Sequence, residues 1–159
     1  MTRQQGREGA GAPSLRDYWD RYVPGVMSAL FALLVVALKL RQHAAFNTRV
    51  YDFARFAQAL WTTVHGRFLF SSLHHGSILG NHFSPLMAAW SPLMAIWADE
   101  RLLFLIQAVN VAAAGLILHR AFKTAAPRAA TWALLLFYLN PALHRLALFE
   151  VRRIVFGMP

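Results

Sequence analysis

Polar residues able to do chemistry occur together at Asp52, Arg55 and Gln58, within residues 51–64 (YDFARFAQALWTTV). A carboxylate whose ionisation is tuned by a nearby Arg and by a low-dielectric surrounding can act as a general base or hold a metal ion. Asp52 is therefore a candidate catalytic residue, and Arg55 and Gln58 are candidate substrate-binding residues. The alternative is that Asp52 only compensates the positive end of a helix dipole.

His82 lies in the run GNHFSP at residues 80–85, and three further histidines precede it at positions 65, 74 and 75. These histidines could form a metal site, but no two of them show the i, i+4 spacing of a helical zinc motif. We therefore predict no metal ligands among them. His82 is a candidate substrate-binding residue, although a His at this place could also cap a helix or lie among lipid headgroups.

Glu150, Arg152 and Arg153 follow the last apolar run of the chain. Arg binds phosphate through paired hydrogen bonds, so Arg152 and Arg153 are candidates for binding a lipid phosphate. The alternative for both Arg residues is ordinary contact with lipid headgroups. The sequence holds no Gly-rich phosphate loop and no Ser nucleophile elbow, so spacing alone defines no reaction.

The elements that position these residues must lie partly in lipid. Of the 159 residues, 57% are hydrophobic and 14% are charged, whereas about 25% of the residues in a soluble domain are charged. The net charge of +9 does not indicate nucleic-acid binding, because the Arg residues lie at the ends of apolar runs. No Cys is present, which excludes disulfides and thiolate metal sites. We predict an all-α membrane protein.

Three apolar runs, at residues 23–40, 102–122 and 129–149, are long enough to be transmembrane helices. A cleaved signal peptide is the alternative for the first run. Lys39 and Arg41 stand where its cleavage site would be, so the sequence favours a retained helix. We expect the Lys39 side chain to snorkel toward the membrane surface.

The charge pattern predicts which side of the membrane each part faces. Residues 83–98 are interrupted by two prolines and are short for a span, so we expect a juxtamembrane or re-entrant helix that does not cross. The basic tail, residues 1–22, then shares one side with the basic turn at 120–128, and the positive-inside rule makes that side cytoplasmic. The loop at 42–100, with its amphipathic juxtamembrane helices, would be external. Residues 23–159 would form one module in the plasma membrane.

The motifs that carry a family resemblance are YDFARFAQALW at 51–61, HGRF at 65–68, GNHFSP at 80–85, LFE at 148–150 and FGMP at 156–159. Together they resemble the predicted bacterial and archaeal membrane proteins of domain of unknown function 2079. The relatives of that family are the GT-C glycosyltransferases, multi-span enzymes that use polyprenyl-phosphate-linked sugars. The resemblance implies a catalytic acid early in the first external loop, matched by Asp52, and a second after the third span, matched by Glu150. The family pattern has a second Asp where this chain has Ala57, and a His where it has Arg152.

The resemblance therefore implies the N-terminal part of a longer membrane glycosyltransferase. Its partners would be membrane lipid and a polyprenyl-phosphate-linked sugar donor. The cofactor is left open, and a divalent metal is one candidate. The alternative is a non-catalytic membrane scaffold that kept the fold and lost the chemistry, which the changes at Ala57 and Arg152 would explain.

Overall fold

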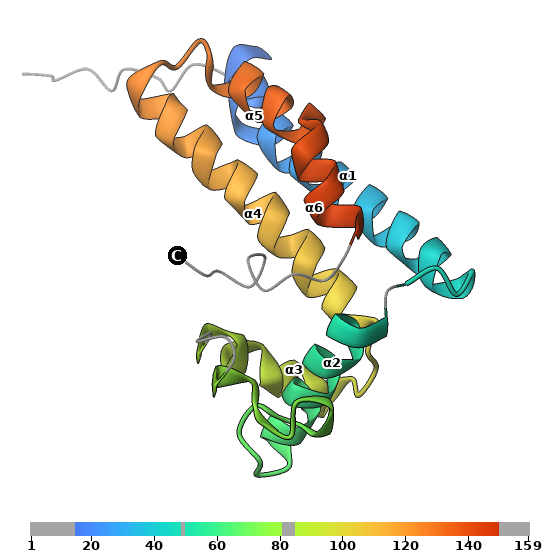
Figure 1. Cartoon of the computed structure of the whole chain (residues 1–159). Coiled ribbons are helices and arrows are strands. Elements are labelled where there is room, and N and C mark those ends of the chain that lie inside the picture. Colours follow the sequence, from blue (N-terminus) through green and yellow to red (C-terminus); the bar gives the residue numbers. More distant parts are fainter. Residues whose placement is uncertain (1–14, 49, 81–84, 150–159) are drawn as a thin grey trace, which may run out of the picture.

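A computed structural model of the chain describes residues 15–48, 50–80 and 85–149, and this part of the chain is almost entirely helical (Figure 1). In chain order the elements are α1 (Leu15–Ala44), α2 (Val50–Val64), β1 (Phe70–Ser71), the 3-10 helix η1 (Ser72–His74), β2 (Gly76–Ser77), the 3-10 helices η2 (Ile78–Gly80) and η3 (Pro85–Trp90), α3 (Ser91–Ile96), α4 (Leu102–Ala125), α5 (Ala130–Leu139) and α6 (Pro141–Phe149). Two of them are long and apolar enough to cross a membrane, over Tyr18–Ala44 and Leu102–Ala125. The prediction of an all-α membrane protein is confirmed, and α1 begins earlier than predicted, inside the segment 1–22.

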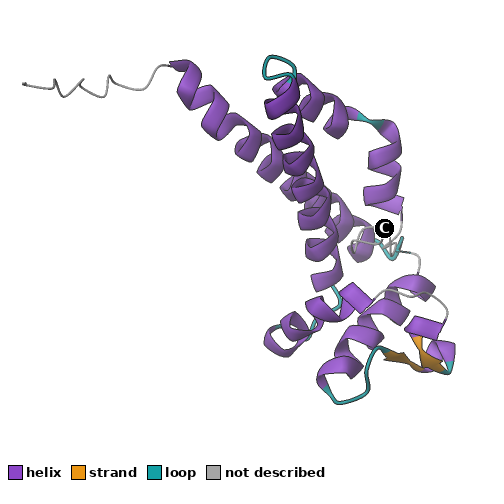
Figure 2. Ribbon diagram, turned by 90° about the vertical axis from the view of Figure 1, so that its left-hand side faces the viewer, coloured by secondary structure: helices purple, strands orange, loops and turns teal. Residues whose placement is uncertain are grey.

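Helices α1 and α4 run in opposite directions along each other. Asp20 Oδ2, near the start of α1, lies 2.6 Å from Lys123 Nζ near the end of α4. At the opposite end of the pair, His43 Nε2 lies 3.7 Å from Glu100 Oε1, just before α4. The connection between α1 and α4 therefore lies at one end of the bundle, and the turn between α4 and α5 lies at the other (Figures 1 and 2). This arrangement agrees with the charge pattern, and the membrane side of each end stays a prediction.

Residues 129–149, predicted as one continuous helix, form two helices instead. Pro141 has no N–H to donate and disfavours helical backbone in the residue before it, and Asn140 accordingly has φ −66° and ψ 120°. Asn140 then caps α6, since the Ala142 N–H donates to its Oδ1 at 2.8 Å. With ten residues, α5 is too short to cross the hydrocarbon core alone. The prediction of an unbroken span is wrong in this respect, and Figure 2 shows the break.

A buried polar contact joins α1, α4 and α5. The Tyr138 hydroxyl of α5 lies 2.7 Å from Ser28 Oγ on α1 and 2.9 Å from the carbonyl oxygen of Ala112 on α4. Ser28 Oγ in turn donates to the Pro24 carbonyl at 2.7 Å. Gly115 leaves room for the phenol, because a Cβ at that position would lie 2.6 Å from Tyr138 Cζ. This contact thus fixes the positions of α1, α4 and α5 relative to one another, although their residues lie far apart in the sequence.

Residues 50–80 and 85–96 form a compact juxtamembrane module at the bundle end where α1 finishes (Figure 1). Its core continues into the start of α4 and contains Phe53, Phe56, Ala59, Leu60, Leu69, Ile78, Met87, Met94, Leu102, Leu103, Phe104 and Ile106. The rings of Phe53 and Phe104 stack with centroids 5.1 Å apart, which attaches α2 to α4. Within predicted segment 83–98, the apolar helical stretch Met87–Ile96 falls short of the length of a span.

The prediction that Lys39 snorkels to the membrane surface is wrong. Lys39 is only 3% exposed, and its ammonium lies 5.7 Å from the centre of the Phe104 ring. This side of α1 packs against α4 and does not face lipid, so the charge is directed at an aromatic face, whose quadrupole attracts cations.

Candidate functional site

The polar stripe of α2 lies under the small β1–β2 hairpin. Tyr51, Arg55, Gln58 and Thr62 follow the i, i+4, i+7, i+11 spacing of one helical face. Arg55 and Thr62 are buried, with 6% and 5% of their surface exposed. Thr62 Oγ1 donates to the Phe70 carbonyl at 2.7 Å, which attaches the hairpin to this face. Arg55 and Thr62 on this face are thus covered by protein, whereas Tyr51 is 58% exposed.

Asp52 and Arg55 form an ion pair at the start of α2. Asp52 Oδ1 lies 2.8 Å from Arg55 Nη2, and the Arg55 side chain is 7% exposed while that of Asp52 is 36% exposed. The guanidinium also lies over the rings of Tyr51 and Phe56, 5.7 and 5.0 Å from their centroids. Its Nε has no hydrogen-bond partner among the described residues. A buried cation therefore orients a carboxylate that solvent can reach.

Gln58, predicted to bind substrate, contacts the hairpin. Its Oε1 accepts hydrogen bonds from Ser71 Oγ at 2.9 Å, from the Ser72 N–H at 2.9 Å and from Ser72 Oγ at 3.2 Å. Its Nε2 lies 2.9 Å from Ser72 Oγ and donates to it. These contacts explain an amide at this position without any substrate, and a role in substrate binding stays a prediction.

The remaining flank of α2 borders two neighbouring cavities, which we call together the Glu100 groove. The larger, of about 450 Å³, is lined by His43, Phe46, Thr48, Phe53, Ala54, Ala57 and Glu100. The smaller, of about 240 Å³, is lined by Ala57, Gln58, Trp61, Met94, Ala98 and Glu100. Ala57 and Glu100 belong to both linings, so the two cavities meet there. The larger has the size of an ordinary small-molecule site.

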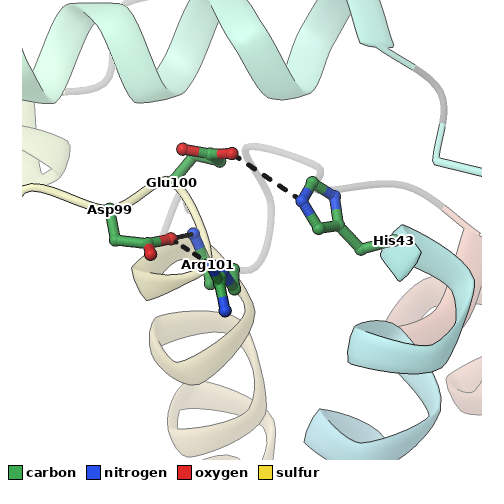
Figure 3. Close-up of polar contacts among 4 residues, drawn as sticks. All are labelled: His43, Asp99, Glu100 and Arg101. Atoms are coloured by element: carbon green, nitrogen blue, oxygen red, sulfur yellow. Dashed lines mark hydrogen bonds and ion pairs between the residues drawn. The ribbon is translucent and has the colours of Figure 1, made fainter. Parts of the chain in front are cut away.

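Glu100 and its neighbour Asp99 are directed to different partners (Figure 3). The Glu100 side chain is 51% exposed and faces His43 at 3.7 Å. The Asp99 carboxylate instead lies 3.2 Å from Arg101 Nε and accepts a hydrogen bond from the Arg101 N–H at 2.8 Å. Glu100 is therefore the carboxylate that the groove presents, and none of the described residues that line it is a Lys or an Arg.

The predicted site residues fall into three groups. Asp52 and Arg55 lie together, and neither lines the Glu100 groove. Gln58 lines the smaller cavity of that groove. The others, His82, Glu150, Arg152 and Arg153, lie outside the described residues. The end of α6 that precedes Glu150 is nevertheless placed: Gln107 Nε2, near the start of α4, donates to the Leu146 carbonyl at 3.0 Å. Helix α6 therefore ends at the bundle end that carries the juxtamembrane module.

His43 and Glu100 were not predicted as site residues. The sequence did contain a signal, because Asp99 and Glu100 are adjacent acids directly before an apolar helix in a chain with only seven acidic residues. Their contact with the end of α1 depends on the folded arrangement. Among the described residues, no group of three or more His, Asp or Glu side chains is placed to hold a metal ion.

The fold defines a class: an all-α membrane protein with a juxtamembrane module at one end of its helices. Residues 42–159, well over half of the chain, match the family model described as predicted membrane protein (DUF2079), and the chain belongs to that family. No curated protein and no solved structure matches the chain. The family resemblance is thus confirmed, and the relation to GT-C enzymes stays a prediction.

Proposed function

We propose that this chain forms the N-terminal part of a membrane glycosyltransferase that uses a polyprenyl-phosphate-linked sugar. The observation that carries the proposal is the Asp52–Arg55 pair, in which a buried guanidinium 2.8 Å away orients a carboxylate that is 36% exposed. A general base needs this combination, because it must be fixed in direction and still reachable by the group that it deprotonates.

In the proposed transfer, the oxygen of an acceptor hydroxyl attacks the anomeric carbon of the sugar. The bond from that carbon to the phosphate oxygen breaks, and its electron pair leaves with the polyprenyl phosphate. The hydroxyl proton passes to Asp52. Arg152 and Arg153 would stabilise the charge on the leaving phosphate, and Glu150 would assist. The other proposed substrate contacts are Arg55, Gln58 and His82.

The ion pair favours Asp52 as a base over Asp52 as a metal ligand. A divalent cation bound to this carboxylate would lie beside the Arg55 guanidinium, which is already 2.8 Å from Oδ1. Two cations at such a distance repel each other, most strongly in a low-dielectric surrounding. The position of α6 is compatible with a shared site, since its last turns lie beside the start of α4.

The test is sugar transfer by a full-length family member in proteoliposomes, with a radiolabelled sugar on polyprenyl phosphate. Asn at the position of Asp52 keeps the shape of the side chain and removes its basicity, and we expect transfer to fall by about 100-fold or more. Asn at the position of Asp99, whose carboxylate is paired with Arg101, is the matched control and should keep the activity. Unchanged transfer with Asn in place of Asp52 would refute the proposal.

A second candidate function is that of a non-catalytic membrane scaffold. The observation that favours it is Ala57, a residue without a polar group that lines both cavities of the groove. The same assay separates the two candidates. A folded, full-length protein that carries Ala at this position and transfers no sugar from any polyprenyl-phosphate donor would support the scaffold.

A further inference from the structure

The Glu100 groove lies on a different flank of α2 from the Asp52–Arg55 pair, and Gln58, in its smaller cavity, is the one described residue of the proposed transferase reaction that lines it. It combines a volume of about 450 Å³ in its larger cavity with walls that are mainly aromatic and small apolar side chains. We propose that this groove binds an amphiphile with an ammonium head group. The ammonium would pair with Glu100, and the apolar part of the ligand would lie along the walls.

The negative charge of Glu100 favours a cationic ligand. Glu100 is shared by both cavities, and the described residues that line them include no Lys and no Arg. Arg101, the residue that follows Glu100 in the chain, is paired with Asp99 at 3.2 Å. The polar group that faces Glu100 is the His43 ring at 3.7 Å, a distance that leaves the pair loose. A carboxylate held in this way attracts a cation and repels phosphate and other anions.

Aromatic walls add to the same preference. Phe46 and Phe53 line the larger cavity, and Trp61 lines the smaller one. Aromatic faces attract ammonium groups through their quadrupole, and cages of such rings are a common means of binding them. Thr48 contributes a hydroxyl oxygen, since its buried Oγ1 has no hydrogen-bond partner among the described residues. An ammonium has three N–H donors, enough for Glu100 and Thr48 together.

The backbone of Phe46 supports a role for its ring. Phe46 has φ 53°, a left-handed conformation that bulky residues rarely adopt. It stands just past the end of α1, where its N–H donates to the His43 carbonyl at 3.0 Å and the Asn47 N–H donates to the Gln42 carbonyl at 2.9 Å. Gly is the usual residue at that place in this type of helix end. Strained backbone conformations cluster at ligand-binding sites, and Phe46 combines such a conformation with a position beside a cavity.

The experiment uses the absence of native Cys from the chain. The substitution Ala57→Cys places a single thiol where the two cavities meet, in protein reconstituted into lipid nanodiscs. The rate at which N-ethylmaleimide alkylates this thiol is measured with three probes of equal chain length: n-hexylammonium, n-hexanol and n-hexanoate. We expect n-hexylammonium to slow alkylation about fivefold more than either of the others, because its hydrogen bond to Glu100 is charge-assisted.

Two matched variants locate the effect. Glu100→Gln keeps the size of the side chain and removes its charge, so the protection by n-hexylammonium should fall to the level of n-hexanol. Asp20→Asn removes a charge that is paired with Lys123 at the opposite end of the bundle, and should keep the protection. Because both variants lose one negative charge, they alter the partition of the probe into the nanodisc equally.

A third variant, Phe46→Gly, relieves the left-handed backbone and removes one aromatic wall. It should keep the fold and lower the protection by n-hexylammonium. Equal protection by all three probes, no protection by any, or equal effects of Glu100→Gln and Asp20→Asn would each overturn the proposal. Protection that is unchanged in Phe46→Gly would overturn the role of the aromatic wall.

Discussion

Replacement of Gly115 by Ala should destabilise the helix bundle by disturbing the contact that joins α1, α4 and α5. A Cβ at this position would lie 2.6 Å from Tyr138 Cζ and 2.9 Å from Cε1, and it would overlap the hydroxyl oxygen. The phenol would have to move away from α4. Its hydroxyl would then leave hydrogen-bond distance of Ser28 Oγ and of the Ala112 carbonyl, which lie 2.7 Å and 2.9 Å from it.

The expected magnitude follows from three terms. The Tyr138 hydroxyl has one proton, and Ser28 Oγ donates its own to the Pro24 carbonyl, so one net hydrogen bond is lost, which costs about 0.5–1.5 kcal/mol. An overpacked methyl group adds about 1–3 kcal/mol of strain. The better helix propensity of Ala offsets about 1 kcal/mol. The sum is a loss of about 0.5–3.5 kcal/mol in the free energy of unfolding of Gly115→Ala.

The assay is unfolding in mixed micelles with increasing SDS, followed by Trp fluorescence. Gly25→Ala is the matched control, because it also lies within a long apolar helix and a Cβ there meets nothing within 4 Å. We expect Gly25→Ala to be as stable as the wild type, or more stable by up to about 1 kcal/mol. If both variants unfold at the same SDS fraction, the packing of Tyr138 against Gly115 is refuted.

Two further predictions concern the juxtamembrane module. Phe46→Gly should raise the free energy of unfolding by about 1 kcal/mol, because Gly adopts a φ near 53° without strain. SDS unfolding measures this change, and a variant less stable than the wild type would contradict the prediction. Gln58→Ala removes an amide oxygen that accepts from Ser71 and Ser72 at three contacts, so residues 70–77 should exchange amide hydrogens faster, with a local loss of about 1–3 kcal/mol. Hydrogen-exchange mass spectrometry measures this, with α4 as the internal reference. Unchanged protection of the hairpin would contradict the stabilising role of Gln58.

Hydropathy and helical periodicity predicted much of the fold, because both are local properties. The long apolar runs correspond to α1 and α4, and the apolar stripe that includes Phe53 and Leu60 is buried as its spacing requires. Pro141 also indicates a break in the helix, but the prediction of one span followed the high average hydropathy of residues 129–149. A proline outweighs average hydropathy here, because it removes a specific hydrogen bond.

Contacts between distant segments could not be predicted in the same way. Lys39 was expected at the membrane surface, but it is buried, with its ammonium near the ring of Phe104 on another helix. Gln58 was predicted to bind substrate, and its contact with Ser72 of the hairpin could not be read from the sequence. The Glu100 groove requires that the end of α1, one flank of α2 and the start of α4 meet, and no local pattern encodes that meeting.

The central claim is that the juxtamembrane module and the α4–α5 turn face opposite sides of the membrane. Single-cysteine labelling in intact cells with a membrane-impermeant maleimide tests it, since the chain has no native thiol. We predict that His74→Cys is labelled in intact cells, whereas Thr124→Cys is labelled only after the cells are lysed. Labelling of both positions, or of neither, before lysis would contradict the account.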